Sequence, residues 1–153
     1  MTKAHTSTLA TMFLLVVSGC EKPDLVATIA PLANATVNAN DNAEVPVQVI
    51  VTNQGKAKTG EFKVSTYFTD PDGNTFVGPF VVPSGTRTTL APGASHTFNG
   101  VMVFSHGNNR STTVKIKALA DSCASDEFMP EYCRVQESNE ENNYSEEKEV
   151  QLP

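Results

Sequence analysis

The sequence of 153 residues lacks tryptophan, has three cysteines, and contains no apolar run of the roughly 20 residues that a membrane-spanning helix needs. Its formal net charge is −6 and its basic residues form no patch, which argues against binding to the phosphate backbone of nucleic acid. It has no Gly-rich phosphate loop and no nucleophile elbow, and neither His96 nor His106 has an acid at a catalytic spacing. These absences predict a chain that is neither an enzyme nor a nucleic-acid-binding protein.

The first feature that is present is a short apolar segment, residues 9–17, which follows Lys3 and precedes a cysteine. About nine mostly apolar residues suit the central part of an export signal and are too few to span a bilayer. The run Val-Ser-Gly before Cys20 resembles the lipobox of bacterial lipoproteins, in which the cysteine receives lipid and the signal is removed before it. The alternative is a short buried core segment with an ordinary cysteine.

The lipobox resemblance divides the chain into three parts. It implies a signal peptide over residues 1–19 that is removed, a lipidated tether over residues 20–23, and a domain over residues 24–153. The lipid on Cys20 would hold the domain to a membrane of the bacterial cell envelope. Glu21, directly after the cysteine, favours the outer membrane in a cell that has one.

The two remaining cysteines, Cys123 and Cys133, lie close together in the sequence. An even pair in an exported domain favours a disulfide, because the compartment is oxidising. A bridge closing so short a loop would contribute about 2.5–3 kcal/mol in the chain-entropy model. Two free thiols, or half of a metal site, are the alternatives.

Apolar and polar residues alternate along most of the domain, as in strands with one buried face. Turn signals recur at roughly ten-residue intervals, among them Asp-Pro-Asp-Gly-Asn at 70–74, and no segment predicts a helix. Gly78 and Pro79 interrupt one strand, which is therefore expected at a sheet edge or with a bulge. The pattern predicts an all-β fold, an antiparallel β-sandwich with Greek-key connections. The expected strands are 24–31, 44–53, 62–68, 75–82, 95–104, 113–120 and 147–152.

Four short motifs occur in a fixed order along the domain: Asp-Leu-Val at 24–26, Val-Ile-Val-Thr-Asn-Gln-Gly at 49–55, Leu-Ala-Pro-Gly at 90–93, and Glu-Ser-Asn-Glu-Glu-Asn-Asn at 137–143. Together they resemble CARDB, the cell-adhesion-related domain found in bacteria. The resemblance implies an immunoglobulin-like sandwich of about seven strands that serves as a binding or spacer module in exported proteins. This chain departs from the family by having a single domain and an enlarged loop, residues 122–134.

The last part of the chain is acidic and offers a candidate metal site. Ten acids lie between Asp121 and Glu149, against Arg134 and Lys148. Carboxylate and amide oxygens are the ligands that calcium prefers. The candidate calcium ligands are Asp121, Glu137, Asn139, Glu140 and Asn143. The alternative is a turn without metal, because asparagine tolerates left-handed backbone and bonds its own loop.

The sequence therefore predicts a lipid-anchored envelope module without catalytic activity. Its loops would contact a protein or a glycan, and it would not bind nucleic acid. A small envelope hydrolase, a metal-dependent enzyme and a purely structural spacer are the alternatives.

Overall fold

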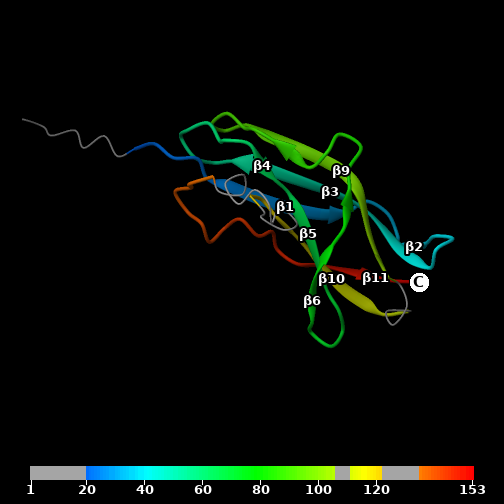
Figure 1. Cartoon of the computed structure of the whole chain (residues 1–153). Coiled ribbons are helices and arrows are strands. Elements are labelled where there is room, and N and C mark those ends of the chain that lie inside the picture. Colours follow the sequence, from blue (N-terminus) through cyan, green and yellow to red (C-terminus); the bar gives the residue numbers. More distant parts are fainter. Residues whose placement is uncertain (1–19, 106–110, 122–134) are drawn as a thin grey trace, which may run out of the picture.

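The computed structural model describes residues 20–105, 111–121 and 135–153, and all of its regular secondary structure is β-strand (Figure 1). The all-β prediction is confirmed. The expected signal peptide, residues 1–19, and the expected disulfide between Cys123 and Cys133 lie outside the described residues. Across the described ranges, no helix has the length and apolar character that crossing a membrane requires.

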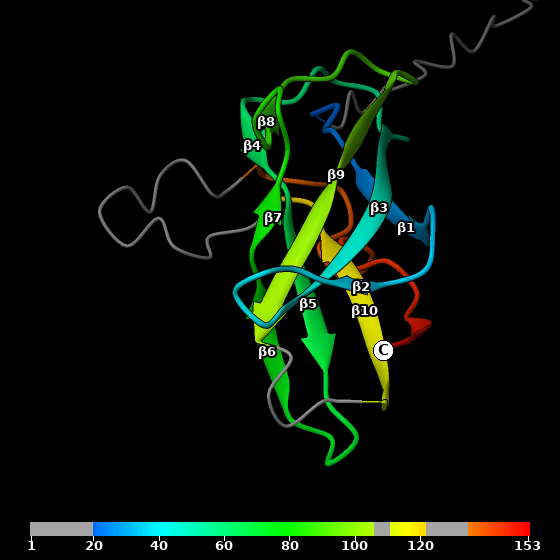
Figure 2. The ribbon, with the colours of Figure 1, turned by 90° about the vertical axis from the view of Figure 1, so that its right-hand side faces the viewer.

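The larger sheet has the order β1-β3-β9-β7, and every neighbouring pair in it is antiparallel. A short strand, β2, also pairs with the start of β3. The bounds are β1 Leu25–Pro31, β2 Thr36–Val37, β3 Asn42–Asn53, β7 Phe80–Val81 and β9 Ser95–Ser105. The two long strands, β3 and β9, run side by side through the middle of the molecule (Figure 2).

The second sheet has the order β11-β10-β5-β6, again antiparallel throughout. A separate two-stranded ribbon joins β4 to β8. The bounds are β4 Phe62–Lys63, β5 Ser65–Thr69, β6 Thr75–Gly78, β8 Arg87–Thr88, β10 Thr113–Leu119 and β11 Lys148–Gln151. The β5–β6 hairpin extends from the end of the sandwich opposite to the chain start (Figure 2).

The hydrophobic core lies between the two sheets, and strand alternation explains its composition. Burial alternates at every residue of β3, and Val45, Val47, Val49 and Val51 are fully buried. Because successive strand side chains point to opposite faces, this sequence can bury one face of the sheet. The same core includes buried side chains from β9 and β10, among them Phe98 and Ile116.

The segment predicted as one interrupted strand, 75–82, divides between the two sheets. Its first half, β6, is an edge of the second sheet, and its second half, β7, is an edge of the first. The change of sheet falls at Gly78 and Pro79, where a Cβ on Gly78 would lie 2.8 Å from the Met102 side chain. Because proline donates no ladder hydrogen bond, the sequence predicts a sheet edge at Pro79. The chain passes from one sheet to the other at this residue, between two edge strands.

Other sequence-based expectations differ from the structure in detail. Residues 36–37 form β2 inside a region that lacks an expected strand, and the expected strand 62–68 is divided at Val64 into β4 and β5. The turn at 70–74 is confirmed, with hydrogen bonds between Asp70 and Asn74 and a positive φ of 87° at Gly73.

Candidate functional site

The candidate site lies where the start of the domain meets its last loop. We call residues 22–25 together with 137–143 the junction. The Ser138 amide donates to the Pro23 carbonyl at 2.8 Å, the Leu25 amide donates to Glu137 Oε2, and Asn142 Nδ2 donates to Asp24 Oδ1 at 2.9 Å. The loop, orange in Figure 1, therefore lies against the blue chain start, although more than 110 residues separate them in sequence.

Asn53, at the end of β3, holds the chain start from the other side. Its side chain is fully buried, and Oδ1 accepts from the amides of Asp24 and Gly55, both at 3.1 Å. Its Nδ2 donates to the carbonyls of Ala57 at 2.8 Å and Leu90 at 3.2 Å. Both lone pairs of the oxygen and both hydrogens of the nitrogen are used, so Asn53 acts as a fixed structural connector.

Gly55 lets the chain start pack closely against the end of β3, because any side chain at this position would overlap the backbone of residues 22–24. A Cβ on Gly55 would lie 2.4 Å from the Lys22 carbonyl oxygen and 2.5 Å from the Asp24 amide nitrogen. The Lys22 carbonyl also accepts from the Lys56 amide at 3.0 Å. Thus the four motifs that carry the family resemblance, though widely separated in sequence, are joined by hydrogen bonds at one end of the sandwich.

Three side-chain oxygens in the last loop are buried without a hydrogen-bond partner in the described part of the chain. They are Glu137 Oε1, Asn142 Oδ1 and Asn143 Oδ1. Glu137 is 4% exposed and Asn143 is 8% exposed, so bulk water does not solvate them freely. Leaving a buried polar group unsatisfied costs about 1–3 kcal/mol, and more when the group is charged. A water molecule, a proton or a cation would satisfy oxygens of this kind.

The environment of Glu137 disfavours its negative charge. Burial raises the pKa of Glu137 from 4.5 to about 7, and the charges of Asp121 and Glu140 act in the same direction. The Leu25 amide and the Asn143 side chain act in the opposite direction, because they favour the carboxylate. A buried carboxylate among other acids therefore needs either a proton or a cation beside it.

The five residues predicted as calcium ligands play different parts in the loop. Asp121, with a φ of 52°, accepts from the Val135 amide through Oδ2 at 2.7 Å, and its charge acts on Glu137. Asn139 Oδ1 accepts from the Glu141 amide at 3.1 Å, and Glu140 Oε1 accepts from the Glu137 amide at 2.9 Å. Asn139 and Glu140 thus shape the turn, whereas Glu137 and Asn143 keep oxygens available.

The donor set fits a hard cation better than a transition metal. Within the described ranges, no three histidine, cysteine, aspartate or glutamate side chains form a group that could hold a metal by themselves. An ion here would need amide oxygens and water beside carboxylate, which calcium accepts and zinc does not favour. Sequence reasoning indicated Asn142 and Glu137 as residues of this loop but missed the contacts of Asn142 with Asp24 and of Glu137 with Leu25. Neither a local motif nor spacing signals contacts across 112–118 residues.

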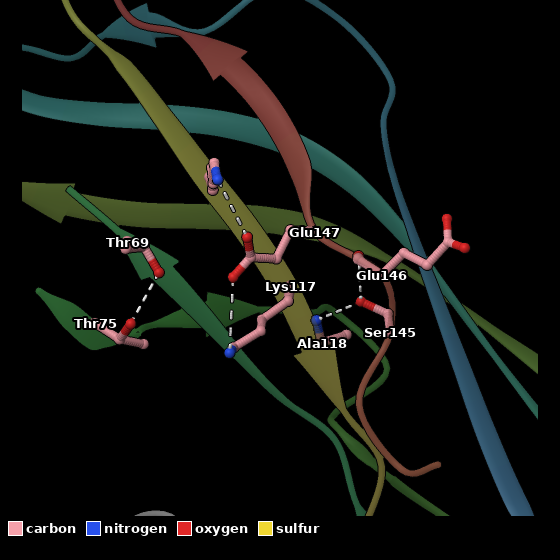
Figure 3. Close-up of polar contacts among 8 residues, drawn as sticks. Thr69, Thr75, Lys117, Ala118, Ser145, Glu146 and Glu147 are labelled. Carbon is pink, nitrogen blue, oxygen red and sulfur yellow. Dashed lines mark hydrogen bonds and ion pairs between the residues drawn. The ribbon is translucent and has the colours of Figure 1, made fainter. Parts of the chain in front are cut away.

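The outer face of the second sheet carries ordinary surface contacts. Lys115 and Lys117 approach Glu147 at 3.6 and 3.9 Å, and Figure 3 shows Glu147 reaching over β10 toward Lys117. Lys117 Nζ also lies 5.0 Å from the centre of the Tyr144 ring. On the first sheet, the His96 ring lies edge-on to the Phe98 ring, with 4.6 Å between the ring centres.

Comparison with known proteins shows similarity to one family of domains. The family model CARDB matches residues 22–147. The chain is similar to the solution NMR structure of the CARDB domain of PF1109 from Pyrococcus furiosus, at 22% identity and a TM-score of 0.51, covering 86% of this chain and 96% of that chain. A crystal structure of that domain in complex with di-metal ions gives a TM-score of 0.47 at 22% identity, covering 88% and 97%. No curated protein sequence matches the chain.

Proposed function

Because the chain belongs to the CARDB family, we propose that it is a lipid-anchored binding module of the bacterial cell envelope whose last loop holds a calcium ion. The family is an adhesion-related, non-catalytic type of module. The membrane anchor, the ion and the contact with an envelope protein or glycan are the parts that go beyond the family assignment.

The junction is the observation that carries the proposal. Residues 22–25, which begin two residues after Cys20, are fixed by Asn53 on one side and by Glu137 and Ser138 on the other. Cys20 itself is exposed. A domain that is fixed this close to its lipid would be displayed at the membrane surface with little freedom of orientation.

The unpaired oxygens of the last loop support the ion. Calcium would be held by Glu137 and Asn143, and the charge of Asp121, which acts on Glu137, would favour a cation there. Asn139 and Glu140 would shape the turn. The ion would neutralise the buried carboxylate and satisfy oxygens that otherwise lack partners in the described part of the chain. It would thereby fix the contact between the first strand and the last loop.

The lipid anchor is tested by metabolic labelling with a palmitate analogue in a bacterial host. Wild type should incorporate label and be shortened by signal removal, whereas Cys20→Ala should remain unlabelled and unprocessed. Ser18→Ala is the matched control, because it keeps a small residue before the cysteine. Equal labelling of wild type and Cys20→Ala would contradict the anchor.

The binding role is tested with envelope fractions from the same host. The purified protein should bind membrane-protein or cell-wall fractions saturably, and unlabelled protein should compete. Glu147→Gln is a surface control that should bind as wild type does. Binding that never saturates, or turnover of an envelope substrate by the pure protein, would contradict a non-catalytic binding module.

A further inference from the structure

The two sheets have four edge strands, and three of them are protected against pairing with a further strand. Ala27 and Ile29 of β1 are buried, so the backbone along that edge is not accessible. Strand β11 contains the charged residues Lys148 and Glu149, and β7 has only two residues and directly follows Pro79. Burial, charge, proline and shortness are the usual means by which edge strands are kept free of partners. Strand β6 has a different character.

The edge of β6 is accessible and uncharged. Thr75 is exposed, Phe76 is 48% exposed and Val77 is 54% exposed. Residues 73–86 contain no charged side chain, although the whole chain has a formal charge of −6. Within the described part of the chain, β6 pairs with β5 on one side and with no strand on the other. An accessible edge of this kind is a template for a further strand.

The backbone groups of Thr75 and Val77 point away from β5. At the turn of the hairpin, the Asp70 amide donates to the Asn74 carbonyl at 3.0 Å. Every second pair of an antiparallel ladder is hydrogen-bonded, so Phe76 is bonded to β5, whereas Thr75 and Val77 are not. The N–H and C=O groups of these two residues are therefore directed to the outer side of β6, where a partner strand could reach them.

We propose that β6 pairs with β6 of a second copy of this chain, antiparallel and centred on Phe76. In this register Thr75 of each copy lies opposite Val77 of the other, and each of these two pairs exchanges two backbone hydrogen bonds. The two Phe76 side chains meet at a position without hydrogen bonds, where opposite side chains are closest and aromatic pairs stabilise a sheet. The second sheets of the two copies become continuous.

Charge favours a second copy as the partner of this edge. No charged group on β6 would select a charged strand, whereas the same edge of another copy is equally uncharged and apolar. The acidic loop 137–143 lies against the chain start, and the β5–β6 hairpin extends from the opposite end of the sandwich (Figure 2). Antiparallel pairing of the hairpins therefore holds the two acidic loops apart, which limits the repulsion between two negatively charged copies.

The arrangement also determines where the two anchors lie. Strand β6 runs along the length of the sandwich, so antiparallel pairing reverses the second copy end to end (Figure 2). If Cys20 carries lipid, which rests on the proposed function, the two anchors lie at opposite ends of the pair, and the pair joins two membranes. Because β6 has four residues, each contact is weak, and many copies on facing membranes would act together.

Sedimentation equilibrium of the purified protein tests the pairing. Wild type should show a reversible equilibrium of monomer and dimer, and Val77→Lys should weaken the dimer by about tenfold or more, because a charge on an edge strand disfavours pairing. Val37→Lys is the matched control, since Val37 is 39% exposed and lies on β2, outside the contact. It should dimerise as wild type does. A protein that stays monomeric up to its solubility limit, or equal weakening by both variants, would overturn the inference.

Hydrogen exchange resolved by residue tests the register in the wild-type protein. As the protein concentration rises, exchange of the Thr75 and Val77 amides should slow by about tenfold or more. The Phe76 amide is already bonded to β5 and should change little. Protection confined to another edge strand, with no change at Thr75 and Val77, would overturn the inference.

Vesicles of phosphatidylethanolamine and phosphatidylglycerol test the arrangement of the anchors. Lipidated protein should cluster them, which light scattering would detect, and Val77→Lys at equal surface density should not. Vesicles that carry the protein but remain separate would overturn the antiparallel arrangement. If the dimer forms but the protein does not bind envelope fractions, the proposed function fails and the inference stands. If that binding persists with a protein that stays monomeric, only the inference is overturned.

Discussion

Two regions of this domain are held together in opposite ways. The β3–β9 pair has a continuous register from Asn42↔Ser105 to Thr52↔Ser95, and its inward face consists of buried apolar side chains. The junction has no regular ladder, and its contacts join single amides to Asn53, Glu137 and Asn142. In the first region backbone pairing and burial reinforce each other. The second leaves buried side-chain oxygens, including one of the two oxygens of the Glu137 carboxylate, unpaired within the described part of the chain.

The difference predicts where the stability of the domain depends on solution conditions. Burial of the valines of β3 follows from strand alternation and needs nothing from outside the chain. Buried oxygens without partners lower stability unless a proton, a water molecule or an ion satisfies them. The junction is therefore the place where stability should respond to solution conditions, and the sheet is the place where it should not.

The largest effect should come from Phe98→Ala in the sheet. Phe98 is fully buried opposite Val49, and removing a buried phenylalanine typically costs about 3–5 kcal/mol. Val81→Ala, at a side chain that is 60% exposed, is the matched control and should change stability by less than about 0.5 kcal/mol. Urea unfolding measures both, and a loss at Phe98 no greater than the loss at Val81 would contradict the assigned core.

Gly55→Ala should destabilise the junction by about 1–3 kcal/mol, since the new methyl group would overlap backbone atoms of residues 22 and 24. Gly60→Ala is its control, because a Cβ there would meet no atom within 4 Å. Thermal unfolding should distinguish the variants, and hydrogen exchange should show faster opening at Leu25 in Gly55→Ala. Equal stability of the two variants would mean that the chain start is not fixed by Gly55.

Without divalent ions, stability should fall as pH rises from about 4.5 to about 7. The folded state binds the Glu137 proton more tightly than the unfolded chain, because the folded pKa is about 7 instead of 4.5. This contribution is complete below the unfolded pKa and is lost as the pH rises through the folded one. Glu137→Gln should flatten the slope and Glu141→Gln, at an exposed position, should not. If Glu137→Gln kept the same slope of stability against pH, the pH dependence would belong to another titrating group.

The smallest effect should come from Glu147→Gln on the outer face of β10. Its ion pairs with Lys115 and Lys117 are partly exposed, and such pairs contribute about 0–1 kcal/mol. Any loss should shrink further in high salt. A loss comparable to that of Gly55→Ala would contradict this ranking, because the outer face would then contribute as much as the junction does.

The same contrast explains which features could be predicted from the sequence. Strands β1, β3, β9, β10 and β11 lie within two residues of the expected ranges, because each alternates over several residues. The two-residue strands β2, β4 and β8 carry no such periodicity. Glu137 and Asn143 could be proposed from their residue types, but the contacts of Glu137 with Leu25 and of Asn142 with Asp24 join distant segments. Local sequence does not encode which distant backbone amide a side chain will reach.

Calcium titration of the melting temperature tests the central claim most directly. At pH 8, stability should rise with calcium and saturate, by about 2.7 kcal/mol when calcium is a hundred times its Kd. Sodium at matched ionic strength should do much less, Glu137→Gln should remove most of the rise, and Glu141→Gln should retain it. The rise should also be small at pH 5, where Glu137 is protonated. If calcium and matched sodium give the same melting curve at pH 8, the last loop is a turn without an ion and the proposed calcium site is wrong.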